Sequence, residues 1–305
     1  MTGMDLSVVV PTLNGREQLG DCLDALSEFV PDAEVVVTNG PSADGTTGMV
    51  QERDDVDVLV EVTDRNVNVA RNAGLAVATG DVIALLSYHQ AVEPFWFDAL
   101  EDAIAAGTSV VTGPTHRPLR AGMTTESPET KRIMGRDVSF FNPDNVAMTR
   151  EAVSALDGFD ESIEVGGARD AAHRLAGNGF AVEWREGMSV RSEFQPDGGD
   201  VTGGWETKYR SLAYRLFKNY GVRPTVFRRI VSHGIGDAYR VAKDVLRGDA
   251  TPTAWFGEGK LVLRGMAGGT TGGLVARARD RTSTRNPRGL SVRDDRAVHV
   301  YDWRD

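Results

Sequence analysis

The strongest constraint on the fold of this 305-residue chain is a repeated alternation of short apolar runs with amphipathic segments. The apolar runs have the length and composition of buried strands, and they cover residues 6–10, 34–37, 56–62, 82–86 and 109–111. The segments between them, such as residues 17–29, 70–79 and 95–106, carry apolar side chains at helical spacing. Strands that alternate with helices predict an α/β fold with an open, mostly parallel sheet.

Polar loops follow three of these predicted strands, at residues 11–14, 39–44 and 87–89. The carboxyl ends of parallel strands meet at one edge of a sheet, and ligands of such sheets bind there. We therefore expect these loops to converge on one binding site.

The rest of the chain gives weaker patterns. Residues 115–140 are polar without clear periodicity, which favours a loop, and residues 206–220 predict an amphipathic helix. Residues 265–273 and 277–288 are rich in Gly or Arg and are expected to be irregular. We therefore predict one α/β domain over residues 1–200 and a basic, helical extension with an irregular tail over residues 201–305.

The charge distribution separates the same two regions. Residues 1–200 hold 14 Lys and Arg against 34 Asp and Glu, whereas residues 201–305 hold 20 against 10. Asp supplies 27 of the 44 acids and Lys only 5 of the 34 basic residues, a bias that resembles halophilic archaeal proteins. A basic extension favours contact with an anionic membrane surface, and no nucleic-acid-binding motif accompanies it.

The start of the chain and its single cysteine indicate the compartment. The first residues lead almost directly into a strand, without a signal peptide, and no run reaches the roughly 18 apolar residues of a membrane span. One cysteine, Cys22, excludes an intramolecular disulfide and fits a reducing compartment. We expect a cytoplasmic location.

Five short motifs in order resemble the family 2 glycosyltransferases, which are inverting enzymes with a GT-A fold. The motifs are Val8-Val9-Val10-Pro11-Thr12-Leu13-Asn14, Asn39-Gly40-Pro41-Ser42-Ala43-Asp44-Gly45-Thr46, Ala70-Arg71-Asn72-Ala73-Gly74, Ala78-Thr79-Gly80-Asp81, and Gly158-Phe159-Asp160-Glu161 with Arg174-Leu175. The resemblance covers about residues 5–190. It implies a donor-binding site for a nucleotide sugar that includes Pro11, Thr12, Asn14, Asn39, Asp44, Arg71 and Asn72. Arg71 would offer a fixed cation to the anionic nucleotide, whereas Asp44 and Asn72 alternatively fit a turn-capping role.

The chain departs from this family after the fourth predicted strand. The family's aspartate-rich motif, which holds a divalent cation, is replaced by Ser87-Tyr88-His89. His89 occupies the last motif position, so we expect it either to ligate Mn²⁺ or Mg²⁺ or, when protonated, to bond a donor phosphate directly.

A second departure concerns the catalytic base. Alignment on Arg174-Leu175 puts Gly167-Ala168 where the family carries its Glu-Asp pair. Asp170 is then the nearest surviving carboxylate, with Glu164 and Asp160 as further candidates.

The resemblance implies an enzyme that moves one sugar from a nucleotide sugar to a lipid-linked glycan. Given the halophilic composition, the chain is similar to haloarchaeal enzymes that assemble dolichol-phosphate-linked glycans for S-layer protein N-glycosylation. Such an enzyme would be peripheral, at the cytoplasmic face of the cell membrane, and would act beside other enzymes of the pathway. The alternative is a non-catalytic GT-A-like module that binds a nucleotide or glycan and supports a partner glycosyltransferase.

Overall fold

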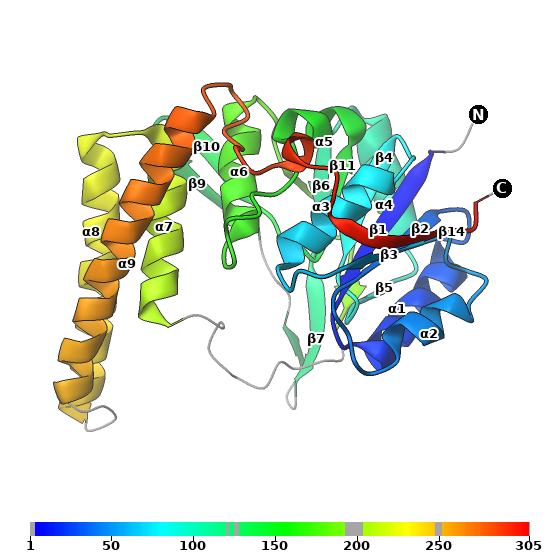
Figure 1. Ribbon diagram of the computed structural model, residues 1–305, viewed down its shortest axis with the longest axis horizontal. Coiled ribbons are helices and arrows are strands. Elements are labelled where there is room, and N and C mark those ends of the chain that lie inside the picture. Colours follow the sequence, from blue (N-terminus) through cyan, green and yellow to red (C-terminus); the bar gives the residue numbers. More distant parts are fainter. Residues whose placement is uncertain (1–3, 120–121, 125–127, 193–203, 248–251, 305) are drawn as a thin grey trace. The chain divides into compact units, whose positions relative to one another are not determined.

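The computed structural model describes residues 4–119, 122–124, 128–192, 204–247 and 252–304. The chain forms two compact units (Figure 1). The first comprises Met1–Ser162, Gly167–Asp197 and Arg288–Asp305, and the second comprises Ile163–Gly166 and Gly198–Pro287. The domain boundary expected at residue 200 lies outside the described residues.

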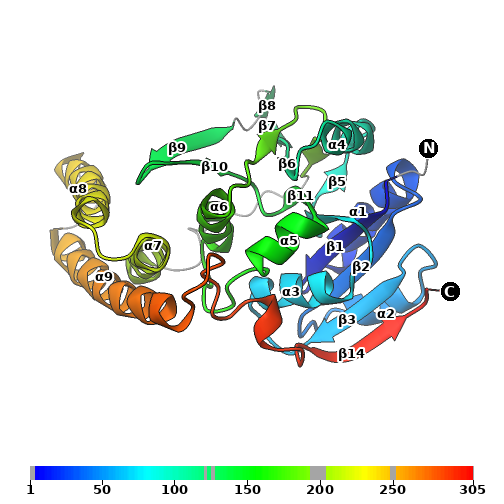
Figure 2. The same cartoon turned by 90° about the horizontal axis from the view of Figure 1, so that it is seen from above.

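The first unit is built on a twisted eight-stranded sheet in the order β12-β6-β11-β4-β1-β2-β3-β14 (Figure 2). The strands are β1 (Leu6–Thr12), β2 (Glu34–Asn39), β3 (Val58–Val62), β4 (Val82–Leu86), β6 (Val110–Thr112), β11 (Asn145–Thr149), β12 (Glu183–Trp184) and β14 (Ala297–Asp302). β1 runs parallel to β2 and β4, whereas β11 and β14 run antiparallel to their neighbours. The predicted α/β class and mostly parallel sheet are confirmed.

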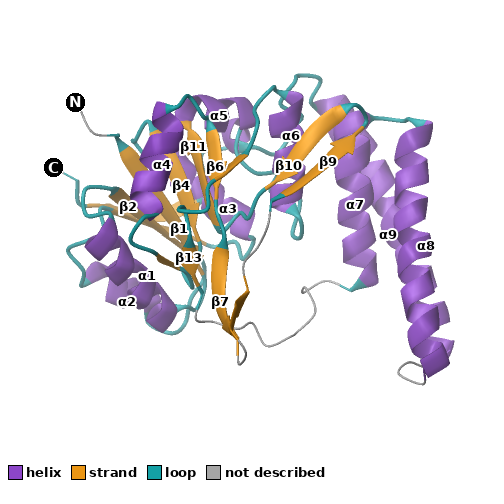
Figure 3. Cartoon of the chain, turned by 180° about the vertical axis from the view of Figure 1, so that it is seen from behind, coloured by secondary structure: helices purple, strands orange, loops and turns teal. Residues whose placement is uncertain are grey.

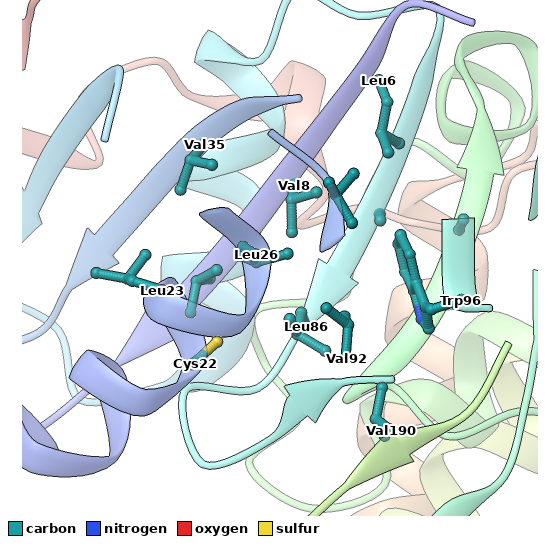
Figure 4. Packing of buried hydrophobic residues seen from close by; sticks show 14 of the residues in the cluster. Leu6, Val8, Cys22, Leu23, Leu26, Val35, Leu86, Val92, Trp96 and Val190 are labelled. Atoms are coloured by element: carbon teal, nitrogen blue, oxygen red, sulfur yellow. The ribbon is translucent and has the colours of Figure 1, made fainter. Parts of the chain in front are cut away.

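Helices cover both faces of this sheet. The helices of the first unit are α1 (Arg16–Phe29), α2 (Thr46–Gln51), α3 (Val67–Val77), α4 (Trp96–Ala105), α5 (Arg150–Leu156), α6 (Gly167–Gly177) and the short 3-10 helix η1 (Leu290–Val292). On one face, Leu23 of α1 and Trp96 of α4 pack with Val8 and Leu86 in a fully buried apolar cluster (Figure 4). Burying these side chains supplies most of the driving force for folding.

The opposite face of the sheet is covered by α3, and one glycine allows the close approach. A β-carbon built on Gly74 would lie 2.3 Å from Cγ1 of Val9 and 3.0 Å from Cγ2 of Thr38. Only glycine therefore fits at this contact between α3 and the strands β1 and β2, which explains the residue that ends the Ala70–Gly74 motif.

The expectation of a loop over residues 115–140 is wrong. Four strands lie in this region: β7 (Thr115–Leu119), β8 (Gly122–Thr124), β9 (Glu129–Ile133) and β10 (Arg136–Phe140). β7 and β8 join β5 (Ala91–Val92) and β13 (Val190–Arg191) in a second sheet. β9 and β10 form a hairpin whose central residues, Met134 and Gly135, have φ values of 52° and 86°. A turn of this kind matches the twist of two paired strands. The rest of this polar sequence carries little pattern that predicts the strands.

In the described part of the second unit, the helices α7 (Trp205–Tyr220), α8 (Pro224–Arg247) and α9 (Pro252–Arg279) lie alongside one another (Figure 3). The helix expected over residues 206–220 is confirmed as α7. Its apolar side chains, including Leu212, Leu216 and Phe217, are buried. They therefore pack inside this unit and are not available to a membrane.

The expectation that residues 265–273 are irregular is also wrong, because they form part of α9. Gly265, Gly269 and Gly273 recur at four-residue spacing and face α7. A β-carbon on any of them would lie 2.2–2.4 Å from a backbone oxygen of α7. Glycine costs about 1 kcal/mol in a helix interior, and the close packing of the two helices offsets this cost at these positions.

The last residues return to the first unit. β14 pairs antiparallel with β3, and the hydroxyl of Ser291 donates to the carboxylate of Asp157 at 2.9 Å. Arg296, which is 5% exposed, bonds the carboxylate of Glu161 through its Nε atom. The strand β14 thus forms one edge of the central sheet, although it lies within the extension over 201–305 that is expected from charge.

Candidate active site

The loops that follow β1 and β2 interlock at the carboxyl edge of the sheet. Asn14, which has a φ of 52°, accepts a hydrogen bond from the backbone nitrogen of Ala43 at Oδ1, over 2.8 Å. Its own backbone nitrogen donates to Oγ of Ser42 at 2.8 Å, and the nitrogen of Gly40 donates to the oxygen of Thr12 at 2.9 Å. The two loops therefore hold each other in one conformation.

Pro11 and Thr12 form the end of β1 and are buried. The Thr12 hydroxyl is enclosed and makes no hydrogen bond with the described residues. A buried hydroxyl without a partner costs free energy, so a polar ligand atom at this position would be favourable.

Asn39 and Asp44 use their side chains to shape the second loop. Asn39 is 1% exposed, accepts from Ser42 Oγ at 2.7 Å and donates to Thr47 Oγ1 at 3.0 Å. Asp44 is exposed, and its carboxylate accepts from the Thr46 hydroxyl at 2.5 Å and from the Arg16 nitrogen at 3.1 Å. Burial opposes ionisation of Asp44, but these hydrogen bonds outweigh it and lower its pKa. Asp44 is thus an ionised acceptor at the surface of the loop.

Arg71 of α3 is 5% exposed and points toward the same edge. Its Nη2 atom lies 3.0 Å from Oδ1 of Asp144, and its Nη1 atom donates to Oδ1 of Asn68 at 3.2 Å. Burial lowers the pKa of Arg71, and the Asp144 carboxylate opposes that effect. The side chain is therefore an enclosed cation whose charge is already balanced by one carboxylate.

Asn72, the next residue of α3, has no exposed surface. Its Nδ2 atom donates to the oxygen of Phe159 and to Oε1 of Glu161, each at 2.8 Å, and its Oδ1 accepts from the nitrogen of Phe159 at 2.8 Å. These bonds tie α3 to the Gly158–Glu161 motif. Asn72 thus links α3 to the residues that follow α5.

The segment after β4 packs against the loop after β1. The ring of Tyr88 lies on Gly15, where a β-carbon would approach its Cε2 atom to 2.2 Å. Tyr88 meets the ring of His89 edge to face with centroids 5.2 Å apart, and Nδ1 of His89 lies 2.8 Å from the Ser87 hydroxyl. The three loops predicted from the sequence therefore meet at this edge.

His89 has limited access to solvent, and its charge state follows from its surroundings. Burial lowers the pKa of His89, the Asp144 carboxylate raises it, and Arg117 lowers it again. The net direction is downward, which favours the neutral imidazole at neutral pH.

Asp144 is a site residue that the sequence did not reveal. β11 pairs antiparallel with β4, with Asn145 opposite Leu86, and the oxygen of Asp144 accepts from the nitrogen of Ser87 at 3.0 Å. Asp144 therefore lies beside Ser87-Tyr88-His89, the residues that replace the family's aspartate-rich motif. The only sequence signal is an acidic residue in the turn Asn142-Pro143-Asp144 just before a short apolar strand.

The three candidate bases lie in different environments. Asp170 and Arg174 are fully buried and form an ion pair at 2.8 Å, and Asp160 is buried with its Oδ1 atom bonded by the hydroxyl and nitrogen of Ser162. Glu164 is exposed and belongs to the second compact unit. Only Glu164 offers its carboxylate to solvent.

The described residues do not assemble a complete metal site by themselves. No three His, Cys, Asp or Glu side chains within them come together as a metal-binding group. Protein groups of suitable chemistry at this edge are the imidazole of His89 and the carboxylate of Asp144.

Comparison with known proteins supports the same family. Residues 7–155 match the family model described as "Glycosyl transferase family 2". The Haloferax volcanii protein named glycosyltransferase AglE is 27% identical over 115 residues, which are 35% of this chain and 36% of AglE. The chain thus spans about a third of the length of that relative.

Solved glycosyltransferases share the fold at low sequence identity. The mannosyltransferase PcManGT from Pyrobaculum calidifontis, solved with GDP-Man and Mn²⁺, superposes with a TM-score of 0.57 at 17% identity, over 92% of this chain and 89% of that one. Residues 1–349 of S. aureus TarS, solved with UDP, superpose with a TM-score of 0.56 at 14% identity, over 91% of each chain. The GT-A fold expected from the sequence is thereby confirmed. Residues 7–155, just under half of the chain, thus match the model of glycosyl transferase family 2, and the domain that they form resembles that family.

Proposed function

We propose that this chain transfers one sugar from a nucleotide sugar to a glycan carried on a lipid. The observation that carries the proposal is the convergence of the β1, β2 and β4 loops with Arg71 and Asp144 at the carboxyl edge of a family 2 domain. Similar proteins were solved with GDP-Man and with UDP. The enclosed Thr12 hydroxyl, Asp44 and Arg71 supply the acceptor and donor groups with which such a nucleotide is bound.

The proposed reaction inverts the anomeric configuration. The oxygen of an acceptor hydroxyl attacks the anomeric carbon, the bond between that carbon and the phosphate oxygen breaks, and the nucleoside diphosphate leaves with the bonding electrons. A protein carboxylate takes the proton of the attacking hydroxyl. Burial of Asp160 and Asp170 weighs against both as this base, and Glu164, an exposed residue of the second unit, stays a candidate from the sequence alone.

A divalent cation is part of this proposal, since PcManGT was solved with Mn²⁺. His89 or Asp144 would hold such an ion, which would neutralise charge on the leaving diphosphate. The neutral imidazole favoured by the surroundings of His89 suits ligation of an ion better than a bond from a protonated ring to phosphate.

A lipid-linked acceptor is supported by the composition of the second unit and by the resemblance to AglE of a halophilic archaeon. The finer proposal is dolichol-phosphate-linked glycan assembly for S-layer protein N-glycosylation at the cytoplasmic face of the membrane, beside other enzymes of that pathway. No helix among the described residues has the length and apolar character needed to cross a bilayer. Attachment would then be peripheral.

The donor site is tested by calorimetric titration of the purified protein with UDP- and GDP-sugars. Asp44→Ala should weaken binding about tenfold, the scale of one lost charge-assisted hydrogen bond. Asp102→Ala, which removes an exposed carboxylate of α4, is the matched control and should bind like the wild type. Equal affinity in the wild type and Asp44→Ala removes Asp44 from the site.

Transfer itself is tested in a deletion strain by mass spectrometry of lipid-linked and protein-linked glycans. Loss of one sugar, restored by the wild-type gene and not by Glu164→Gln, supports the enzyme and the base. Unchanged glycans together with intact nucleotide-sugar binding would instead identify a non-catalytic binding module.

A further inference from the structure

An apolar groove of about 600 Å³ lies within the three-helix second unit. Its walls come from all three helices: Trp205 and Tyr209 of α7, Ile235 and Ala238 of α8, and Leu263 and Met266 of α9. Its volume is in the range of small-ligand sites, which are about 300–1,000 Å³.

The groove is open, and its apolar walls are in contact with solvent. Val231, Ile235 and Leu263 line it and are 52%, 66% and 68% exposed. Exposed apolar side chains that gather in one concave place are unfavourable in water and mark a binding surface. Covering them with hydrocarbon would recover part of this free energy.

Asp237, the acidic residue on the groove wall among the residues that the structure describes, is neutralised within the protein. Asp237 is 5% exposed and accepts from Nζ of Lys208 at 2.7 Å and from the Tyr209 hydroxyl at 2.6 Å. Arg240 bonds the second carboxylate oxygen of Asp237. These contacts lower the pKa of Asp237 against the opposing effect of burial. The carboxylate is thus paired with Lys208 and Arg240, which offsets its repulsion of an anion at the groove.

The helices around the groove carry an excess of cations. Residues 224–247 and 252–279, the spans of α8 and α9, hold nine Lys and Arg against three Asp and Glu, in a chain whose net charge is −10. Lys260 itself lines the groove. An apolar trough in a basic surrounding is complementary to a molecule that joins a hydrocarbon chain to an anionic head.

We propose that this groove binds the isoprenoid chain of a prenyl phosphate lipid, with the phosphate beside the surrounding cations. The groove lies wholly in the second unit, so the proposal needs no contact with the donor site. It rests on the proposed function for the choice of an isoprenoid lipid that bears a phosphate.

The test is calorimetric titration of the full-length protein with geranylgeranyl monophosphate below its aggregation concentration, without a sugar donor. Leu263→Glu should weaken binding about tenfold or more, because a charge replaces an apolar wall. Leu261→Glu is the matched control: Leu261 is also an exposed leucine of α9, at 40%, but does not line the groove. It should bind like the wild type, and circular dichroism should show both variants folded.

The proposal would be overturned if Leu263→Glu bound the lipid with wild-type affinity, or if Leu261→Glu lost as much affinity as Leu263→Glu. It would also be overturned if inorganic phosphate alone bound with the same affinity as the lipid. Light scattering that shows a wild-type dimer abolished by Leu263→Glu would likewise assign the groove to a second copy of the chain. The titration contains no sugar donor, so its outcome does not depend on glycosyl transfer. Lipid binding in this titration, together with unchanged glycans in the deletion strain, would refute the proposed function and leave the groove assignment intact.

Discussion

The Nη2 atom of Arg71 on α3 lies 3.0 Å from Oδ1 of Asp144, which immediately precedes β11. The arginine side chain is 6% exposed and the aspartate 33%. The pair links α3 to the residue before β11, more than 70 positions later in the chain. Asp144 also contacts the segment that follows β4, because its backbone oxygen accepts a hydrogen bond from Ser87. The pair supplies a carboxylate and a cation where the family's aspartate motif is missing.

This pair predicts a measurable coupling. Arg71→Ala should lower the free energy of unfolding by about 1–3 kcal/mol, because Asp144 loses its partner in a partly buried place. Asp144→Ala should cost a similar amount, since it leaves the enclosed Arg71 cation unbalanced. Urea unfolding of both variants and of the double variant measures the interaction. Strictly additive losses would show that the pair contributes no coupling.

His89 predicts a pH-dependent stability. Its folded-state pKa is lowered mainly by burial, so the unfolded chain takes up the proton more readily. This contribution to stability is complete above the unfolded pKa of about 6.5 and is lost as pH falls from there through the folded pKa. Urea unfolding between pH 5 and 8 should show this slope, and His89→Gln should remove it. The same slope in wild type and variant would assign it to another group.

His89 also predicts an effect on turnover. If catalysis requires the neutral ring, activity should fall as the pH drops through the folded-state pKa of His89, which burial lowers from its ordinary value. His89→Ala should lower turnover about 10²-fold, the scale of one lost electrostatic contact to developing charge. An activity that instead rises toward acid pH would support a protonated ring that bonds phosphate, and wild-type turnover in His89→Ala would remove the residue from catalysis.

Attachment to an anionic membrane should depend on α8. Leu212, Leu216 and Phe217 of α7 are buried, and Lys218 has no exposed surface. Substitutions of these residues would therefore alter folding stability and would not test membrane binding. On α8, by contrast, Phe227, Val231, Ile235 and Tyr239 recur every four residues and are 48–71% exposed.

Flotation with phosphatidylglycerol vesicles at low salt tests this surface. Replacing the exposed cations Arg228 and Lys243 of α8 with Glu should release the protein, because each basic residue near an anionic surface contributes about 1 kcal/mol. Arg132→Glu, which changes an exposed cation of the β9–β10 hairpin, is the control. Retention of the α8 variant at the wild-type level would contradict attachment through α8.

Two adjacent glycines of α9 should respond oppositely to alanine. At Gly269 a β-carbon would lie 2.2 Å from the Arg210 oxygen of α7, whereas at Gly268 its nearest neighbour is Nε of Arg210 at 3.7 Å. Gly268→Ala should raise stability by up to about 1 kcal/mol through helix propensity. Gly269→Ala should lower it by about 1–3 kcal/mol by forcing the helices apart. Equal thermal midpoints for the two variants would contradict the close α7–α9 packing.

The sequence by itself determined the α/β class, the five strands β1, β2, β3, β4 and β6, and the edge at which their loops meet. Each of these follows from local information: a continuous apolar run is a buried strand, and the carboxyl ends of parallel strands share one edge. The same local signals predicted α7 and placed Asn14, Asn39 and Asp44 at or just beyond the ends of strands.

Tertiary structure decided the features that depend on contacts between distant residues. Asp144 reaches the site only because β11 pairs antiparallel with β4, a register that no local pattern encodes. The Gly-rich residues of α9 are helical because α7 packs against their bare backbone, which offsets their poor helix propensity. Asn72 and Asp170 are predicted to bind the donor and to act as the base, and the structure adds that they bond the oxygen of Phe159 and the side chain of Arg174. The identity of a polar residue does not show whether its side chain will bond a ligand or another part of the protein. That depends on which residues the fold places around it.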